Sequence, residues 1–471
     1  MKQNTFDIIV IGAGSGGLNI ASFMNRVGFK VLLIDKSDAH IGGDCLNFGC
    51  VPSKALIHVA RTVKAGKDAE VFGVKQGGEV SWQKVREYIK ERQDIIRHHE
   101  NAEYFREKGM TVVLGTASFV SKNKVSVNGE VYVGKKIVLA TGSRPRVLTS
   151  QGIEKVARVL NNENIFTMES LPERLLVLGA GPIGIELAQA LSYLGSRVTI
   201  VDPGTQILGK EDTEIAGILQ TQMEKEGTSF KLGYSLKEFT DGTTAVLQTK
   251  QGETEIVSFD AVFVGIGRVL NVEGLELKKA GIACDEKGNL IVDPYLRTTN
   301  KNVLVCGDTA GNYQFTHAAE MHAAVILKNF FSLFKKKFTG EGISWTTFTT
   351  PEVATYGFSE AELTKRGIVY RVLKTDFTED DRAVTDEYTY GFSKMYIDTK
   401  GVVLGGTMIA PQAGELISEL VLAQSQRLGV SALFNKTYAY PTASRINKRL
   451  VSSYFAEKLT PFTKKLLRFL Y

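Results

Sequence analysis

Two copies of one glycine-rich pattern constrain the fold of this 471-residue chain more than any other feature. The first copy reads as a strand at residues 6–11, a turn at 12–17, a helix through Arg26 and a strand that ends at Asp35. Glycines in such a turn let the backbone approach a pyrophosphate, and Asp35 can accept the ribose hydroxyls. The alternative is a merely tight turn, but the complete order of elements predicts a dinucleotide site. Its candidate glycines are Gly12, Gly14 and Gly17.

The same unit recurs later in the chain and predicts a second dinucleotide site. A strand at 175–178 leads into a turn at 179–184, a helix through Leu194 and a strand that ends at Asp202. A carboxylate at this place repels a 2′-phosphate and accepts a 2′,3′-diol, so Asp202 favours NADH over NADPH. The alternative interpretation of Asp202 is a residue that closes the strand before Pro203. The candidate glycines of this unit are Gly179, Gly181 and Gly184.

The composition is that of a folded chain with about three domains, since 471 residues are 43% hydrophobic and 23% charged. The net charge of +6 is small for this length and is not gathered into long basic tracts, so nucleic-acid binding has little support. No apolar run approaches membrane-spanning length. The first residues lead directly into a strand and leave no room for a cleaved leader, so we expect a cytoplasmic location.

The segments outside the two units predict further elements. Residues 80–108 have helical periodicity, whereas residues 111–133 alternate like a small sheet. Beyond about residue 345, strands at 394–397 and 402–409 and a helix at 415–428 indicate an α+β domain.

Two C-terminal segments are basic. Residues 335–337 are three consecutive lysines, expected at a solvated helix end. The tail from Thr460 to Tyr471 predicts a short basic helix with one apolar face. Docking of this helix on its own fold or on a second subunit is favoured over contact with a membrane surface.

The run His98-His99-Glu100 invites interpretation as a metal site. Adjacent helical residues diverge by about 100°, and no cysteine or further acid completes a ligand set. A solvated helix face is favoured, and no metal site is expected.

Cys45 and Cys50 lie shortly after the first nucleotide unit and account for half of the four cysteines. So close a pair in a cytosolic chain is more naturally catalytic than a structural disulfide. Pro52 fits a first helical turn, so Cys50 lies at a helix N-terminus, where amide dipoles lower the pKa of a thiol. Lys54 follows one turn later and adds a cation to that field, the alternative being a solvated surface lysine.

Cys284 and Cys306 have no cysteine near them in the sequence. Cys306 ends an apolar strand, where a small buried residue is typical, and we expect both to be structural.

The two units and the run from Cys45 to Lys54 together resemble the class I pyridine nucleotide-disulfide oxidoreductases. These flavoenzymes include dihydrolipoamide dehydrogenase, glutathione reductase and mercuric reductase. The resemblance spans nearly the whole chain. Further matching segments are Ala140-Thr141-Gly142, Gly265-Ile266-Gly267-Arg268 with Asn271, Val305-Cys306-Gly307-Asp308, residues 350–354 and residues 381–383.

The resemblance implies FAD at the first unit and NAD at the second. It implies that Cys50 is the charge-transfer thiolate against the flavin, that Cys45 is the interchange thiol, and that Lys54 pairs with Glu186. Because family members build half of each active site from the partner subunit, it also implies a homodimer. The remaining cofactor-binding residues that it implies are Lys54, Gly115, Thr141, Gly142, Gly267 and Asp308.

The fold class that follows is α/β, with two Rossmann-like dinucleotide-binding domains and a C-terminal α+β dimerisation domain. We expect the FAD-binding domain in two parts, at 1–150 and 271–345. The NAD(P)-binding domain is expected at 151–270 and the dimerisation domain at 346–471.

One C-terminal segment departs from the family. Where dithiol reductases carry a His-Pro-Thr segment followed by a glutamate, this chain has Tyr440-Pro441-Thr442 and Arg445. All six histidines lie at or before His322, so no imidazole is available there. A tyrosine with its ordinary pKa of about 10 shuttles thiol protons poorly at neutral pH. Turnover of dihydrolipoamide or glutathione is therefore expected to be poor.

Tyrosine at this place resembles the mercuric reductases, but their C-terminal cysteine pair is missing, since no cysteine follows Cys306. We expect electrons to pass from NADH, or alternatively NADPH, through FAD to Cys45 and Cys50. The final acceptor is expected to be a small disulfide or a thiophilic metal ion, with Tyr440 in its pocket. The alternatives are a flavin reductase that acts on a quinone and a non-catalytic flavoprotein that senses redox state.

Overall fold

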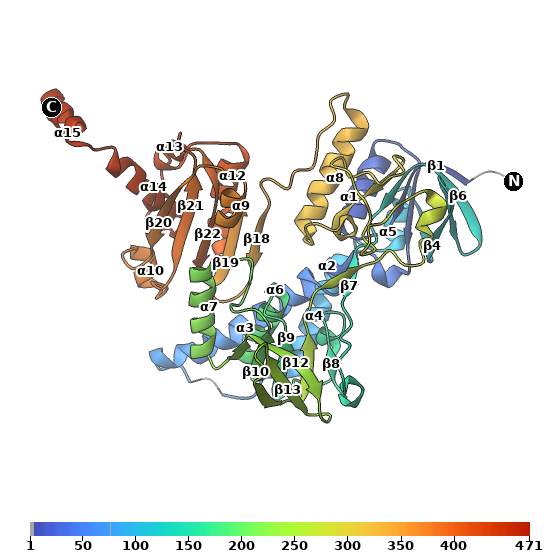
Figure 1. Cartoon of the computed structure of the whole chain (residues 1–471), viewed down its shortest axis with the longest axis horizontal. Coiled ribbons are helices and arrows are strands. Elements are labelled where there is room, and N and C mark those ends of the chain that lie inside the picture. Colours follow the sequence, from blue (N-terminus) through green and yellow to red (C-terminus); the bar gives the residue numbers. More distant parts are fainter. Residues whose placement is uncertain (1–3, 76) are drawn as a thin grey trace.

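The computed structural model describes residues 4–75 and 77–471 (Figure 1). The expectation that no leader precedes the first strand falls partly on residues 1–3, which lie outside the described residues. Within the described ranges, no helix combines the length and the apolar character needed to cross a bilayer.

The first glycine-rich unit builds a mainly parallel sheet. Strand β1 (Asn4–Ile11), helix α1 (Ser15–Arg26) and strand β2 (Val31–Asp35) follow one another as the sequence predicts. The apolar residues of β1 and β2 are buried on both faces, as is usual for parallel strands covered by helices. The sheet has the order β3-β2-β1-β6-β5-β4, and β17 pairs with β6. Its other strands are β3 (Thr111–Leu114), β4 (Ala117–Ser121), β5 (Lys124–Val127), β6 (Glu130–Leu139) and β17 (Val303–Val305).

The second unit builds a parallel sheet of the order β11-β10-β9-β15-β8. Strand β9 (Arg174–Leu178), helix α6 (Pro182–Leu194) and strand β10 (Arg197–Asp202) match the predicted elements closely. The other strands of this sheet are β8 (Val159–Leu160), β11 (Ser229–Leu232) and β15 (Ala261–Val264). A separate antiparallel sheet comprises β12 (Tyr234–Phe239), β13 (Thr244–Thr249) and β14 (Thr254–Ser258).

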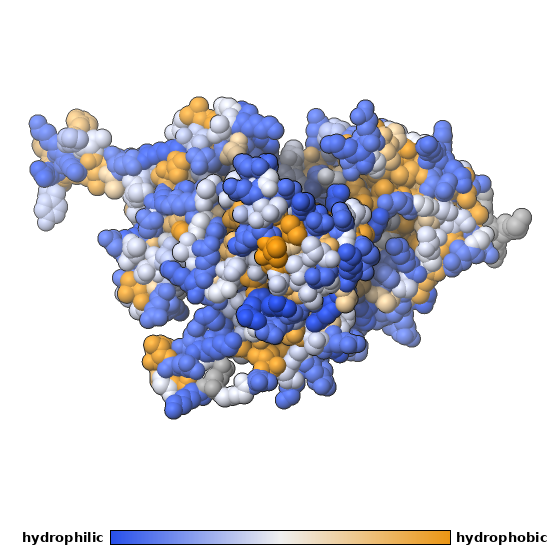
Figure 2. Space-filling model, turned by 60° about the horizontal axis from the view of Figure 1, so that its bottom comes forward, coloured by the Kyte–Doolittle hydropathy of each residue, from blue (hydrophilic) through white to orange (hydrophobic). Residues whose placement is uncertain are grey.

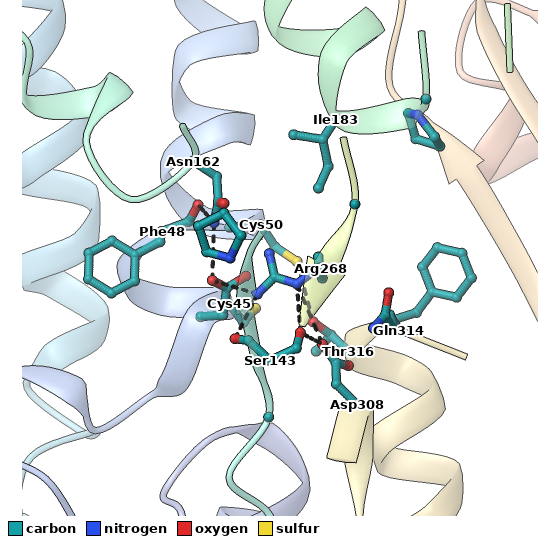
Figure 3. A pocket seen from close by; sticks show the side chains of 18 of the residues that line it. Cys45, Phe48, Cys50, Ser143, Asn162, Ile183, Arg268, Asp308, Gln314 and Thr316 are labelled. Carbon is teal, nitrogen blue, oxygen red and sulfur yellow. Dashed lines mark hydrogen bonds and ion pairs between the residues drawn. The ribbon is translucent and has the colours of Figure 1, made fainter. Parts of the chain in front are cut away.

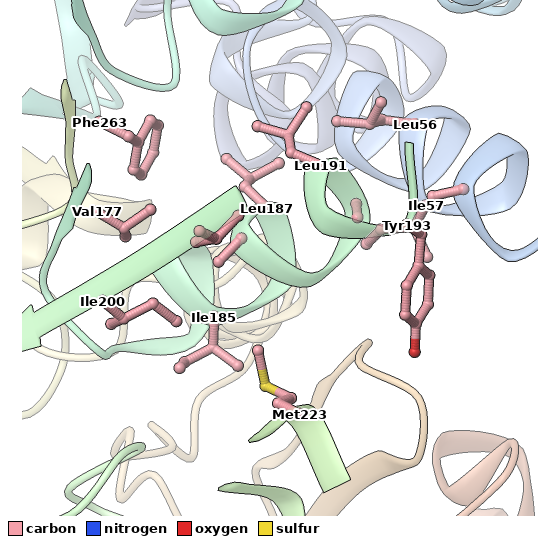
Figure 4. Packing of buried hydrophobic residues seen from close by; sticks show 14 of the residues in the cluster. Leu56, Ile57, Val177, Ile185, Leu187, Leu191, Tyr193, Ile200, Met223 and Phe263 are labelled. Atoms are coloured by element: carbon pink, nitrogen blue, oxygen red, sulfur yellow. The ribbon is translucent and has the colours of Figure 1, made fainter. Parts of the chain in front are cut away.

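A buried apolar cluster holds the helix that carries Cys50 against the second nucleotide unit (Figure 4). Helix α3 (Cys50–Asp68) contributes Leu56 and Ile57, which pack with Leu191 of α6. Helices α4 (Trp82–Arg97) and α5 (Ala102–Glu107) follow, with α4 against α3. Because α3 begins at Cys50, its packing on α6 also fixes the position of this cysteine.

The C-terminal domain is an antiparallel sheet of the order β18-β19-β22-β21-β20. Its strands are β18 (Ser344–Thr347), β19 (Glu352–Gly357), β20 (Arg371–Asp376), β21 (Phe392–Ile397) and β22 (Val403–Ala410). The helix expected over residues 415–428 is instead two helices, α11 (Ala413–Leu416) and α12 (Ser418–Ser425). It ends early because Arg427 has a positive φ of 54°, which a helix does not accommodate.

The remaining helices include α2 (Gly43–Asn47), α7 (Thr213–Lys225), α8 (Thr316–Phe331), α9 (Glu360–Lys365), α10 (Asp381–Thr385), α13 (Val430–Phe434), α14 (Ile446–Glu457) and α15 (Pro461–Leu470). The predicted α/β fold class is therefore confirmed. Two local expectations were wrong. The lysines 335–337 follow α8 in an extended loop, several residues beyond its end, and His98 and His99 lie in a turn after α4.

Candidate active site

Cys45 and Cys50 lie side by side at the junction of α2 and α3, both as free thiols (Figure 3). Thr316, the first residue of α8, places its Oγ1 3.3 Å from Cys50 Sγ. A hydrogen bond from Cys45, together with Thr316 and the charge of Lys54, outweighs burial and lowers the pKa of Cys50 to about 6. The same interaction with Cys50, together with burial and the charge of Glu100, raises the pKa of Cys45. The site thus holds a thiolate at Cys50 and a thiol at Cys45 near neutral pH.

Lys54 forms an ion pair with Glu186, with 2.7 Å between Nζ and Oε2. Glu186 is buried on α6, and its Oε1 accepts a hydrogen bond from the backbone amide of Phe348 at 2.8 Å. The Lys54 ammonium lies 4.4 Å from the centre of the Phe348 ring. The cysteine helix, the second nucleotide unit and the start of the C-terminal domain therefore meet at this lysine.

The two glycine turns have the same geometry. Gly12 has a φ of 104°, and a Cβ there would lie 2.2 Å from the carbonyl oxygen of Ala140. Gly179 has a φ of 105°, and a Cβ there would lie 2.5 Å from the carbonyl oxygen of Gly265. Both positions therefore require glycine, because L residues are strained at this φ and have no room for a side chain.

Each strand-end carboxylate binds its own turn. Asp35 Oδ2 accepts the amide of Ala13 at 2.6 Å, and burial raises the pKa of Asp35. Asp202 Oδ2 accepts the amide of Ala180 at 2.8 Å. Asp202 Oδ1 also accepts the amide of Gly204 at 2.7 Å, so Asp202 does close the strand end. A carboxylate oxygen has more than one lone pair, and both acids still face the cavity described next.

One cavity of about 2950 Å³ connects both turns with the cysteine pair. Gly17 and Gly184 lie behind the turns rather than among its described lining residues. A Cβ at Gly17 would lie 2.0 Å from the oxygen of Gly12, and one at Gly184 2.1 Å from the oxygen of Gly179. The predicted residues that line the cavity are Gly12, Gly14, Asp35, Cys45, Cys50, Lys54, Gly115, Thr141, Gly142, Gly179, Gly181, Glu186, Asp202, Gly267 and Asp308.

These residues fit two dinucleotides. Each half of the cavity has a glycine turn that leaves space for a pyrophosphate at a helix N-terminus and an acid within reach of a ribose. Thr141 and Gly142 close strand β6, and the amide of Gly142 donates to Thr309 Oγ1 at 2.7 Å. Both cysteines line the same cavity.

A polar network around Arg268 was missed by sequence reasoning (Figure 3). Arg268 Nε donates to Ser143 Oγ at 2.6 Å, and this hydroxyl donates to Asp308 Oδ2 at 2.6 Å. The Arg268 guanidinium also lies 3.2 Å from Asp44, the residue before Cys45. Asn162 donates to the same Asp44 oxygen at 3.1 Å. The network ties the cysteine loop to Asp308. Burial raises the pKa of Asp308, and the charge of Arg268 partly offsets this rise.

Tyr440 is not brought to the cysteines within one chain. Its side chain is 67% exposed on the C-terminal domain, and it is not among the described residues that line the cavity. The hydroxyl donates to Asp381 Oδ2 at 3.1 Å, and this interaction raises the pKa of Tyr440. The Arg445 guanidinium lies 5.3 Å from the centre of the Tyr440 ring.

The other two cysteines differ in environment. Cys306 is buried, and its thiol donates to the carbonyl oxygen of Ala319 at 3.4 Å. Burial raises its pKa to about 12, so it is an inert packing residue. Cys284 is exposed and lies in an isolated bridge with Leu290.

Comparison with known proteins agrees with this architecture. Residues 6–323 match the family model described as pyridine nucleotide-disulphide oxidoreductase. Residues 343–450 match the dimerisation domain of the same family. The fold and the site thus define a flavoprotein oxidoreductase with two nucleotide sites.

Individual relatives place the chain more closely. It is 32% identical to dihydrolipoyl dehydrogenase from Chlamydia muridarum over 452 residues, which are 94% of this chain and 96% of the relative. It is 35% identical to the enzyme of the same name from Thermus scotoductus, with the same coverage. The HOCl-induced flavoprotein disulfide reductase RclA from Escherichia coli has a similar structure, with a TM-score of 0.84 and 25% identity over 95% of this chain and 99% of that chain. A Cu(II) complex of that reductase matches with a TM-score of 0.83 at 25% identity, covering 96% of this chain and 100% of that chain.

The chain therefore belongs to the pyridine nucleotide-disulphide oxidoreductase family. It is an NAD(P)H-dependent disulfide oxidoreductase that uses FAD, and its dimerisation domain implies a homodimer.

Proposed function

We propose that this enzyme delivers electrons from NADH, by way of the Cys45 and Cys50 pair, to a thiophilic metal ion or a small disulfide. The observation that carries the proposal is the pair Cys45 and Cys50 in the cavity that joins both nucleotide sites, with Thr316 Oγ1 3.3 Å from Cys50 Sγ. FAD, when bound, supplies the transfer of two electrons between the nicotinamide and the cysteine pair.

Residues of this chain determine where the proton lies when the Cys45–Cys50 disulfide is reduced. Two electrons and one proton convert the disulfide into a Cys45 thiol and a Cys50 thiolate. The Thr316 hydroxyl and the Lys54 ammonium stabilise the thiolate, and Glu186 holds Lys54 in place. Cys45 keeps the transferable proton, because an adjacent thiolate and the charge of Glu100 disfavour a second anion.

A thiophilic metal ion suits this site, because a metal held by thiolates needs no proton from an imidazole. One Hg(II) takes two electrons and leaves as Hg(0), or two Cu(II) ions take one electron each and leave as Cu(I). In either case the disulfide re-forms and one proton is released. The tyrosine at position 440 and the Cu(II) complex of the similar reductase RclA support this acceptor class.

NADH is the proposed donor. Asp202 faces the second nucleotide site with a carboxylate that would repel a 2′-phosphate. No arginine occurs between residues 203 and 210, the segment that follows this strand. A comparison of kcat/KM for NADH and NADPH tests the choice, and a higher value for NADPH would overturn it.

An anaerobic titration with NADH tests the electron path. Oxidised protein should develop a long-wavelength charge-transfer absorption before the flavin band bleaches, since a Cys50 thiolate then lies against oxidised FAD. The reduced protein is next mixed with Hg(II), Cu(II), a small disulfide or a soluble quinone, and reoxidation is followed. Direct bleaching and rapid turnover with the quinone in a Cys45→Ser variant would overturn the proposal in favour of a quinone reductase.

A further inference from the structure

The C-terminal helix α15 stands clear of the protein body. Figure 1 shows it beyond α14 at the end of the C-terminal domain, and Figure 2 shows the same tail projecting from the edge of the surface. None of its residues is buried, and Phe462 and Phe469 are 77% and 85% exposed. The helix is nevertheless well specified locally. Thr460 caps its N-terminus by accepting the amide of Thr463, and Pro461 follows at the first helical position.

The two sides of α15 differ in chemistry. Apolar side chains recur three and four residues apart and form one face. The charged side chains of α15 are all cations and lie on the other side of the helix. The apolar side chains of α15 are Phe462, Leu466, Leu467, Phe469 and Leu470, and its cations are Lys464, Lys465 and Arg468.

A second exposed segment has the same chemistry. The loop after α8 exposes 94% of Leu333 and 87% of Phe334, and lysines 335–337 follow directly. Lys335 donates to the backbone oxygens of Asn329 and Ser332, which fixes the loop against the end of α8. In Figure 1 this loop lies at the top of the molecule beyond α8, whereas α15 lies at its upper left end.

We propose that α15 docks on an anionic lipid surface, with the loop at residues 332–337 as a second contact. A helix with aromatic and aliphatic residues on one face and only cations on the other lies in the plane of a lipid interface. Each cation near an anionic surface strengthens binding about fivefold, which is about 1 kcal/mol. The exposure of the apolar face does not by itself say what covers it. The cations on the other side of the helix indicate that the covering surface is anionic lipid.

A second copy of the chain fits the helix less well. Two α15 helices would bring like charges together, since neither carries an acidic side chain. The match to the family's dimerisation domain ends at residue 450, before α15 begins.

Vesicle flotation with full-length, FAD-loaded protein tests the proposal. The protein should float with phosphatidylcholine vesicles that contain phosphatidylglycerol and stay behind with pure phosphatidylcholine vesicles. Replacing Lys464, Lys465 and Arg468 by glutamine should lower the partition coefficient on the order of a hundredfold. Replacing Phe462 and Phe469 by serine should also release the protein, and replacing Leu333 and Phe334 by serine should weaken binding.

A matched control replaces three exposed lysines elsewhere, Lys250, Lys278 and Lys287, by glutamine. It changes the net charge equally and should bind vesicles like the unchanged protein. Equal loss of binding in this control would show that net charge, not α15, attracts the protein. Failure of the unchanged protein to float at low salt would overturn the proposal. A shift to a smaller oligomer in the Phe462→Ser, Phe469→Ser variant, measured by light scattering without lipid, would assign the helix to a second copy instead.

Discussion

Lys54 adds to the hydrogen bonds from Cys45 and Thr316 in lowering the pKa of Cys50, and it does so through its charge. Lys54→Gln removes this cation and should raise the pKa of Cys50, while Thr316 and the helix N-terminus remain. Iodoacetamide alkylation of reduced protein, followed against pH, measures this pKa directly. Since the lowered pKa keeps Cys50 ionised above pH of about 6, the wild-type rate should halve near that pH. If the pKa rises by one unit, the rate at pH 6 falls about fivefold.

Lys54→Arg is the matched control, because it keeps the positive charge. Its alkylation profile should stay close to that of the wild type. A Lys54→Gln profile that superimposes on the wild type would mean that the thiolate depends on Cys45, Thr316 and the helix N-terminus, without Lys54.

The family resemblance implies that Tyr440 and Arg445 stand where the dithiol reductases carry a base and the acid that orients it. Tyr440→His combined with Arg445→Glu should restore a proton shuttle and raise kcat/KM for dihydrolipoamide at least about tenfold, since general base catalysis contributes about 10² to 10⁴. Activity of the double variant should fall as the imidazole is protonated below pH of about 6.5. Tyr438→His, which lies two residues away and is buried, serves as the control. No gain over that control would show that position 440 does not meet the dithiol.

At the scale of elements, the sequence predicts what is local. The strand, turn and helix of each nucleotide unit are encoded within about 30 consecutive residues, so both units were located closely. The Arg268 network was not predicted, because Asp44, Ser143 and Arg268 are more than 90 residues apart and meet only when three segments fold together. No periodic signal in the sequence marks such a contact.

Mutations in the two glycine turns should have different effects on the binding of FAD and of NADH. Gly12→Ala forces a Cβ onto the backbone of Ala140, so this variant should lose FAD or fail to fold. Gly179→Ala forces a Cβ onto Gly265 in the other unit and should keep FAD while weakening NADH binding at least about tenfold. The ratio of flavin absorbance to protein absorbance and the Kd for NADH measure the two effects.

Gly217→Ala in α7 is the control, because a Cβ there meets open space and its φ is helical. The Gly217→Ala variant should keep FAD and bind NADH like the wild type. Its free energy of unfolding should rise by up to about 1 kcal/mol. Loss of FAD from Gly179→Ala would show that the two units do not fold independently.

At the scale of the whole molecule, one chain does not bring Tyr440 to the cysteines. The cysteines lie in the cavity of the nucleotide domains, whereas Tyr440 lies exposed on the C-terminal domain. The sequence alone indicates Tyr440 only through the family resemblance, which implies that each active site is completed by a second subunit. The match of residues 343–450 to a dimerisation domain provides that subunit.

Mixed dimers test this sharing of sites. A Cys45→Ser homodimer should be inactive, and a Tyr440→Ala homodimer should lose most of its turnover with the metal acceptor. If Tyr440 serves the partner's cysteines, a dimer with one subunit of each kind places both lesions in one site and leaves the other site intact. Such a dimer, co-expressed with two affinity tags and purified over both, should recover about half of the wild-type kcat per dimer. If both groups acted within one chain, each subunit would carry one lesion and the mixed dimer would be no more active than the mean of the two homodimers.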